Sequence, residues 1–290
     1  MKKSFIQLHI AVFLAGFTGI LGRLITLNEG LLVWWRLLIT AVSMWVVFGL
    51  GKRIQPIPTA DKWRIAGIGF IAALHWVSFY GAIKYANVSV ALVCFSSVGF
   101  FTALFEPLLL KRKFVATELL LGLLAMAGIY IIFQFDTRFK TGIVIGVFSA
   151  MLGAVFPVLN RQLLQRMNAE TLMSWEISGG FITLSLLLPF YLKYFPVASL
   201  LPGVHDLLWL LVLSWLCSVW AFRLSGNALK KISAFTVNLT YQLEPLYGIV
   251  LAFIVYGENA YLGASFYAGL FLILLAVVLQ SGRVYMKKAL

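Results

Sequence analysis

Charged residues are scarce in this chain of 290 residues, and acidic ones are the scarcest. Asp and Glu together number 10, against 23 Lys and Arg. All charged residues make up 11% of the chain, compared with about 25% in soluble domains. Hydrophobic residues account for 62%. A soluble core cannot absorb that much apolar sequence, so the composition excludes a soluble protein and indicates an integral membrane protein.

The sequence also lacks the motifs of several enzyme and metal-binding classes. It has no glycine-rich Walker loop, no His-Glu-x-x-His and no Gly-x-Ser-x-Gly, so this chain encodes no ATP motor of that type. Its three histidines, His9, His75 and His205, belong to separate segments, and Cys94 and Cys217 lie within apolar runs. We therefore predict no metal site, no cofactor, no disulfide and no enzymatic activity.

Long apolar segments with short connections occupy nearly the whole chain. A transmembrane helix needs about 20 predominantly apolar residues. We therefore predict an all-α polytopic membrane protein with ten transmembrane helices, at 5–27, 30–50, 63–84, 88–110, 117–134, 141–164, 169–192, 206–229, 233–256 and 262–284.

Basic residues cluster in the connections of one side. If the N-terminus is cytoplasmic, most loop Lys and Arg lie on the cytoplasmic side, and only Lys84, Arg138, Lys140 and Lys193 lie on the other. The positive-inside rule then places both termini in the cytoplasm. The same distribution accounts for the net charge of +13 without a nucleic-acid partner.

Short sequence matches recur at a nearly constant separation. Residues 82–85 (AIKY) end the third segment as 228–231 (ALKK) end the eighth, and other pairs follow at a similar spacing. We predict that residues 1–136 and 140–290 are two copies of one five-helix unit. Because five is odd, the copies have opposite orientations, which is the inverted-repeat architecture of many transporters, with a site near the bilayer midplane.

A glutamate followed by a proline stands in the middle of the ninth segment. A carboxylate at that depth costs several kcal/mol, about 2.5–3.5 on insertion scales, so Glu244 should face a protein interior or a wet cavity. Pro245 has no N–H, which leaves the Tyr241 carbonyl unpaired and weakens the helix there. We expect a substrate site centred on Glu244, with Tyr241, Gln242 and Asn238 beside it and Pro245 as the helix break. The alternative is a structural glutamate beside an ordinary proline kink.

Four further residues are candidate substrate-binding groups. Arg36 and Trp35 lie about 9 Å below the outer end of the second segment, where Arg36 either lines a vestibule or snorkels to the interface. Glu176 has a comparable depth from the opposite face, so the two charges are candidate gate elements. His75 is either a hydrogen-bonded core residue or a proton relay. Tyr80 is expected to supply an aromatic cavity wall.

The chain resembles the EamA type of the drug/metabolite transporter superfamily over nearly its whole length. The resemblance rests on the Ala-Ile/Leu-Lys ends of the third and eighth segments and on 243–246 (LEPL) running to 256–258 (YGE). In the first half, Val98-Gly99 stands where the second half has Glu244-Pro245. The two halves are therefore not expected to be functionally equivalent.

This resemblance implies a bundle of ten helices around a central cavity. It also implies secondary transport by alternating access, often outward, of small organic metabolites such as amino acids or amphipathic drugs. The implied partners are that small-molecule substrate and the lipid bilayer, with protons as a candidate coupling ion, and the implied location is a bacterial inner membrane. An intramembrane enzyme and a non-transporting scaffold are the alternatives.

Overall fold

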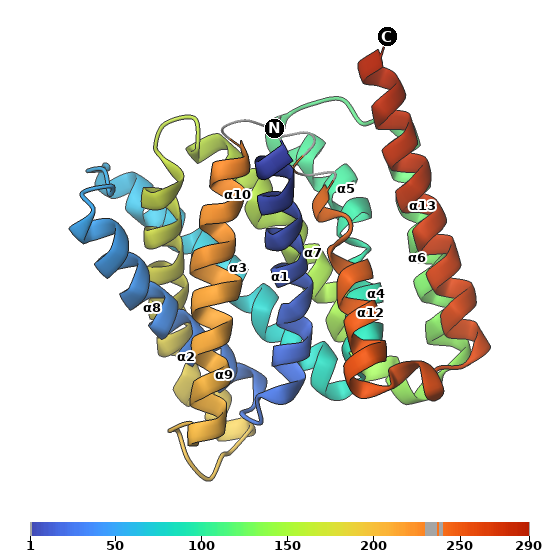
Figure 1. Ribbon diagram of the computed structural model, residues 1–290, viewed down its shortest axis with the longest axis horizontal. Coiled ribbons are helices and arrows are strands. Elements are labelled where there is room, and N and C mark those ends of the chain that lie inside the picture. Colours follow the sequence, from blue (N-terminus) through green and yellow to red (C-terminus); the bar gives the residue numbers. More distant parts are fainter. Residues whose placement is uncertain (1, 230–236, 238–239, 290) are drawn as a thin grey trace.

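The computed structural model describes residues 2–229, 237 and 240–289, and all regular structure in these residues is helical (Figure 1). The first half contains α1 (Lys2–Leu24), α2 (Glu29–Met44), the π-helix η1 (Trp45–Gly49), α3 (Thr59–Tyr85), α4 (Val88–Phe95), α5 (Val98–Leu110) and α6 (Ala116–Phe135). The 3-10 helix η2 (Thr137–Phe139) leads into the second half. That half contains α7 (Lys140–Leu163), α8 (Ala169–Tyr194), α9 (Val204–Ser214), the π-helix η3 (Trp215–Trp220), α10 (Ala221–Leu229), α12 (Glu244–Tyr256), the 3-10 helix η4 (Glu258–Ala260) and α13 (Ala264–Ala289).

Several of these helices begin where the sequence supplies an asparagine cap. The side chains of Asn28, Asn87 and Asn168 accept hydrogen bonds from the backbone N–H groups three residues later, at 2.8 to 2.9 Å. Each cap satisfies a donor that the first helical turn would otherwise leave unpaired. These asparagines therefore fix the starts of α2, α4 and α8.

Nine helical segments of the described residues are long and apolar enough to cross a membrane, and α12 is a shorter apolar helix. The prediction of an all-helical protein with many transmembrane segments is confirmed. The predicted span at 88–110 has the same bounds as a described span, Val88–Leu110, and a break at Ser96 and Ser97 divides it into α4 and α5. The predicted span at 233–256 needs correction, because α12 begins only at Glu244 after a turn at 242–243. Most of the stretch from 230 to 239 lies outside the described residues.

The helix packing relates the two halves by an approximate inverted symmetry. Helix α1 packs against α12 and α10, while its counterpart α7 packs against α5 and α3. Helices α2 and α8 pack against each other, as do α6 and α13 at one side of the bundle (Figure 1). The first helix of each half thus packs mainly against helices of the other half, so each half completes the core of the other.

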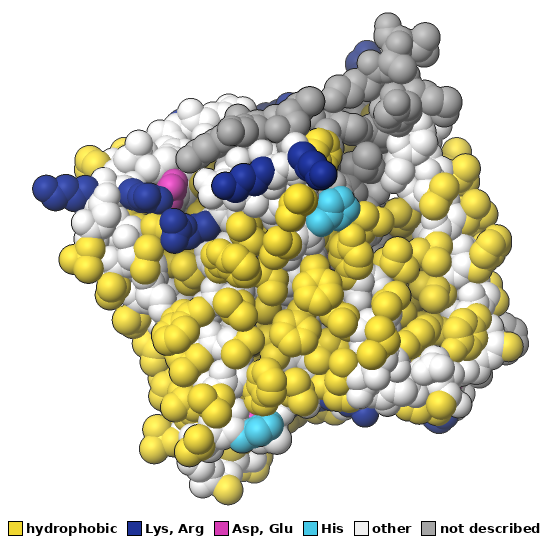
Figure 2. Space-filling view, in the orientation of Figure 1, with side chains coloured by type: hydrophobic (Ala, Val, Ile, Leu, Met, Phe, Trp, Pro, Cys, Tyr) yellow, Lys and Arg dark blue, Asp and Glu magenta, His cyan; other side chains and the backbone are white. Residues whose placement is uncertain are grey.

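Both termini lie at the same end of the bundle (Figure 1). We call this the inner end and the opposite one the outer end, after the orientation that the sequence predicts. Figure 2 shows a broad hydrophobic face with Lys and Arg side chains gathered along its inner edge. Exposed apolar side chains over the height of the bundle are expected where lipid is the solvent.

Candidate functional site

Arg36 is a buried cation held by neutral groups. It lies on α2 and is 6% exposed. Its Nη1 donates to the Tyr80 hydroxyl at 2.8 Å, and its Nη2 donates to Ser218 Oγ at 3.2 Å. The guanidinium lies 4.5 Å from the centroid of the Trp76 ring. Among the described residues it forms no ion pair, so the interior holds an uncompensated positive charge beside two aromatic rings.

A π-helical turn positions the serine that meets this arginine. Ser218 lies within η3, and its hydroxyl also reaches the Leu213 carbonyl, five residues earlier, at 3.2 Å. Single π turns inside longer helices are frequent at functional sites because they displace side chains from the regular register. No sequence pattern predicts this turn. The spacing of Trp76 and Tyr80, four residues apart on α3, does place both on one side of that helix.

Glu244 is the first residue of α12. The chain turns at 242–243, where Leu243 N–H bonds to the Thr240 carbonyl at 3.0 Å, and then starts a new helix. The positive end of a helix dipole favours a negative charge at this position. Glu244 is partly exposed and lies within electrostatic range of Arg36 and of Tyr241. A cation and a carboxylate from different halves of the chain therefore face the same interior region.

The first half has a corresponding break. Helix α4 ends and α5 begins at Ser96 and Ser97, so Val98 starts the new helix as Glu244 does in the second half. Discontinuous helices of this kind form the sites of inverted-repeat transporters because their free backbone groups face a cavity. Pro245 lies in the first turn of α12, where a missing N–H costs little. The break therefore precedes the proline by one residue or more.

Close packing holds α1 against the start of α12. A Cβ added to Gly16 would lie 2.8 Å from the Glu244 carbonyl oxygen and 2.9 Å from Gly248 N. Only glycine allows this approach of two backbones. Tyr241, near the same break, places its hydroxyl 2.5 Å from Ser225 Oγ of α10. Glu244 is thus positioned by helices α1, α10 and α12.

His75 is buried among aromatic rings. Its Nδ1 lies 2.9 Å from both the carbonyl oxygen and the hydroxyl of Ser149 on α7, and the rings of Phe95 and Phe156 lie 5.4 and 5.7 Å away. These contacts link α3 to α7, which is the role of a hydrogen-bonded core histidine. Arg36 is within electrostatic range of it.

The structure does not bring the remaining candidates to this cluster. Trp35 donates to the Leu200 carbonyl at 2.9 Å, in the α8–α9 loop, and the tryptophan that lies against Arg36 is Trp76. Gln242 is exposed and accepts from Ser281 Oγ at 3.5 Å, so it faces α13. Asn238 lies outside the described residues.

Glu176 is buried separately from Arg36. It is 3% exposed and accepts from Asn160 Nδ2 at 2.7 Å. No hydrogen bond or ion pair joins Glu176 to Arg36 in the part of the chain that the structure describes. The two residues therefore form no direct gate in this conformation.

An ion pair between a buried carboxylate and an exposed arginine lies at the outer end of α12. Glu258 is fully buried and accepts from Arg23 Nη1 at 2.5 Å. It also accepts from the N–H groups of Val88 and Ser89, at 3.1 and 2.8 Å, which are the first residues of α4. A carboxylate at a helix N-terminus is favoured by both the free N–H groups and the dipole. This cluster ties together α1, α4 and α12 at the outer end.

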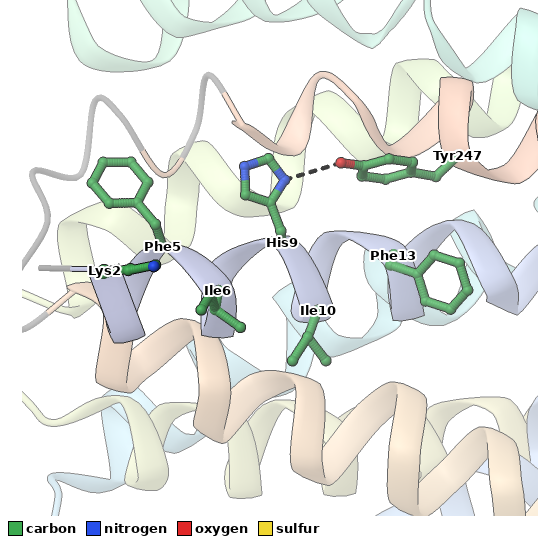
Figure 3. A pocket seen from close by; sticks show the side chains of 7 residues that line it. All are labelled: Lys2, Phe5, Ile6, His9, Ile10, Phe13 and Tyr247. Carbon is green, nitrogen blue, oxygen red and sulfur yellow. Dashed lines mark hydrogen bonds between the residues drawn. The ribbon is translucent and has the colours of Figure 1, made fainter.

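Two pockets lie toward the ends of the bundle. One, of about 440 Å³, is an apolar groove at the inner end of α1, lined by Lys2, Phe5, Ile6, His9, Ile10, Phe13 and Tyr247 (Figure 3). The Tyr247 hydroxyl and His9 Nδ1 lie 3.0 Å apart there. The other, of about 460 Å³, lies at the outer end between the α1–α2 loop, the end of α3 and the α8–α9 loop.

The helical bundle, its paired halves, its broken helices and its buried charges define a membrane transporter of the inverted-repeat kind. The chain belongs to the EamA-like transporter family, whose pattern matches residues 2–134 and 140–282. It is thus a membrane transporter of the drug/metabolite transporter superfamily and not an enzyme.

Two relatives agree with this assignment. An "Uncharacterized transporter" of Archaeoglobus fulgidus is 26% identical over 226 residues, which cover 74% of each protein. A solved structure titled "Crystal structure of protein" superposes with a TM-score of 0.63, covering 94% of this chain and 95% of that chain at 14% identity. At that identity the second likeness concerns the fold alone.

Proposed function

We propose that this protein exports small organic metabolites that carry both charges, such as amino acids, by alternating access across a bacterial inner membrane. The observation that supports this most is the pair Arg36 and Glu244. They come from different halves, lie within electrostatic range, and have no ion pair with each other or with any other described residue. A zwitterion can place its carboxylate at Arg36 and its ammonium group at Glu244.

Aromatic side chains surround the arginine of this pair. Trp76 and Tyr80 contact Arg36 directly, and Tyr241 lies near Glu244. Such rings bury apolar area and favour a solute with an apolar or aromatic body. The proposal further has both termini in the cytoplasm, as the distribution of loop charges favours. It assigns the two repeats to residues 1–136 and 140–290, and it includes protons as a candidate for coupling at Glu244.

The test is exchange transport in proteoliposomes loaded with a mixture of amino acids. We expect Glu244→Gln to insert and fold normally and to lose most exchange, because the amide keeps the size of the side chain and removes its charge. Glu106→Gln is the matched control, since Glu106 lies on the equivalent half-helix α5 and pairs with exposed arginines at the inner surface. Undiminished exchange by a well-folded Glu244→Gln protein would contradict the role of Glu244.

A further inference from the structure

The outer pocket has charged and polar side chains in its walls, unlike the apolar groove at the inner end, and nothing in the proposed central site requires it. Its walls include Glu29, Asn28, Lys84, Tyr85 and Ser199. We propose that it is a second binding site, for the charged end of a zwitterionic solute, on the path between the central cluster and the outer solution. This inference rests on the proposed transport function.

Lys84 supplies the cation of this pocket. Its Nζ donates to the Ile25 carbonyl at 3.1 Å, and an ammonium group has three donors, so donors remain for a ligand. Glu29 and Asp206 lie within electrostatic range, yet Lys84 forms no ion pair with either in the described structure. A lysine on the outer side runs against the charge distribution of this chain, and a binding role accounts for its position.

The two nearby carboxylates differ in how they are engaged. Asp206 uses both oxygens to hold Thr26, at 2.9 Å from its N–H and 2.7 Å from its hydroxyl. Glu29 accepts one hydrogen bond, from the Tyr191 hydroxyl at 2.9 Å, and it lines the pocket. Asp206 therefore stabilises the loop, while Glu29 is the carboxylate available to an ammonium group.

Helix geometry connects this pocket to the central cluster. Glu29 and Arg36 are seven residues apart on α2, so they lie on nearly the same side of that helix, about 10.5 Å apart along its axis. On α3, Trp76, Tyr80 and Lys84 follow one another at intervals of four. Arg36 contacts the first two of these. The same sides of α2 and α3 thus carry polar and aromatic residues from the central cluster outward to the pocket.

The pocket combines opposite charges, which sets the class of ligand. A carboxylate would bind Lys84 and an ammonium group would bind Glu29. The side-chain nitrogen of Asn28, in the wall of the pocket, is also buried without a hydrogen-bond partner among the described residues. A further acceptor at this wall would remove that deficit. A solute with a single charge can pair with Lys84 or with Glu29, but not with both.

Protection of an introduced cysteine tests the proposal. Ser199→Cys places a thiol in the pocket wall, where an aqueous thiosulfonate reagent can modify it, while Cys94 and Cys217 are buried. The Glu244→Gln background disables the proposed central site, so the result does not depend on it. The probes are glycine and phenylalanine, with 3-phenylpropionate and phenethylamine as singly charged analogues of phenylalanine.

We expect a zwitterion to slow modification, and each analogue to do so less well. Lys84→Gln should weaken protection by roughly tenfold or more, the scale of a lost charge-assisted contact, and Lys84→Arg should retain it. Lys193→Gln removes another lysine of the outer side and should leave protection unchanged. No protection by either zwitterion, or protection that survives Lys84→Gln, would overturn the proposal. If the solute protects Ser199→Cys but the wild-type protein shows no transport, the result contradicts the proposed central site and not the outer pocket.

Discussion

Replacing Glu258 by glutamine should weaken the outer end of the bundle more than any comparable change at the inner end. The carboxylate is fully buried and accepts three hydrogen bonds, from Arg23 and from the N–H groups of Val88 and Ser89. Glutamine turns one of the two oxygens into an NH₂ donor that faces other donors. The substitution therefore removes the charge and leaves buried donors unpaired.

The magnitude follows from the burial of the carboxylate, because the Arg23 side chain is 39% exposed. The buried N–H groups of Val88 and Ser89 lose their charged acceptor, and a buried donor left unpaired costs about 1–3 kcal/mol, or about 2–6 kcal/mol for the two. Glu106, by contrast, pairs with Arg112 and Arg161, whose side chains are 57% and 59% exposed. Exposed pairs contribute about 0.2–1 kcal/mol. Two Glu→Gln substitutions in one protein should thus differ in free energy of unfolding by about 1–6 kcal/mol.

Thermal unfolding in detergent, followed by tryptophan fluorescence, measures this difference. At roughly 2–4 °C per kcal/mol, Glu258→Gln should lower the apparent Tm by about 4–24 °C, and Glu106→Gln by a few degrees at most. The variant Arg23→Gln should be less damaging than Glu258→Gln, because it leaves the N-terminus of α4 still paired with a carboxylate. Equal shifts for Glu258→Gln and Glu106→Gln would refute the reasoning from burial.

Three further substitutions test the packing and chemistry around Glu244. Gly16→Ala should lower both Tm and transport, since its Cβ would meet the backbone of α12, whereas Gly67→Ala meets open space and should leave Tm unchanged or slightly raised. Pro245→Ala should retain most transport, because the first half breaks its helix at the equivalent place without a proline; a variant that loses transport entirely would assign the break to the proline itself. Trp76→Leu should raise the half-saturating substrate concentration by about 2- to 30-fold through the lost cation–π contact, and an unchanged value would exclude that contact from binding.

The fold was largely predictable because hydrophobic length determines it. Apolar segments of sufficient length must be helices in a bilayer, since no other open structure satisfies the backbone there. The helix breaks at 96–97 and 242–243 were harder to predict from the sequence. Proline signals one of them, but Ser96 and Ser97 are equally compatible with a continuous helix, and only tertiary packing decides between the two. The π-helices η1 and η3 likewise have no sequence signature.

Residues of the proposed site could be selected from the sequence only where a charge is costly in lipid. That argument selected Glu244 and Arg36 from the sequence, and in the structure Arg36 is buried and Glu244 is partly exposed. The cost of a charge in lipid does not indicate which neutral side chains face the site. Trp35 and Trp76 are equally aromatic, and only the rotation of α2 and α3 decides that Trp76 contacts Arg36. Ser218 could not be selected, because its approach to Arg36 depends on the π turn.

The difference between the two helix breaks has a consequence for the stoichiometry of transport. Symmetry relates Val98 and Gly99 of one half to Glu244 and Pro245 of the other, so the two helix breaks carry one carboxylate instead of two, and Glu106 of α5 pairs with arginines at the inner surface. A site with two equivalent carboxylates can bind two cationic groups, or a divalent one, in each cycle. With one carboxylate, each turnover is expected to move a single cationic group, whether an ammonium group of the substrate or a proton. A fixed stoichiometry of one is therefore expected from a chain whose two halves share a fold and differ in charge.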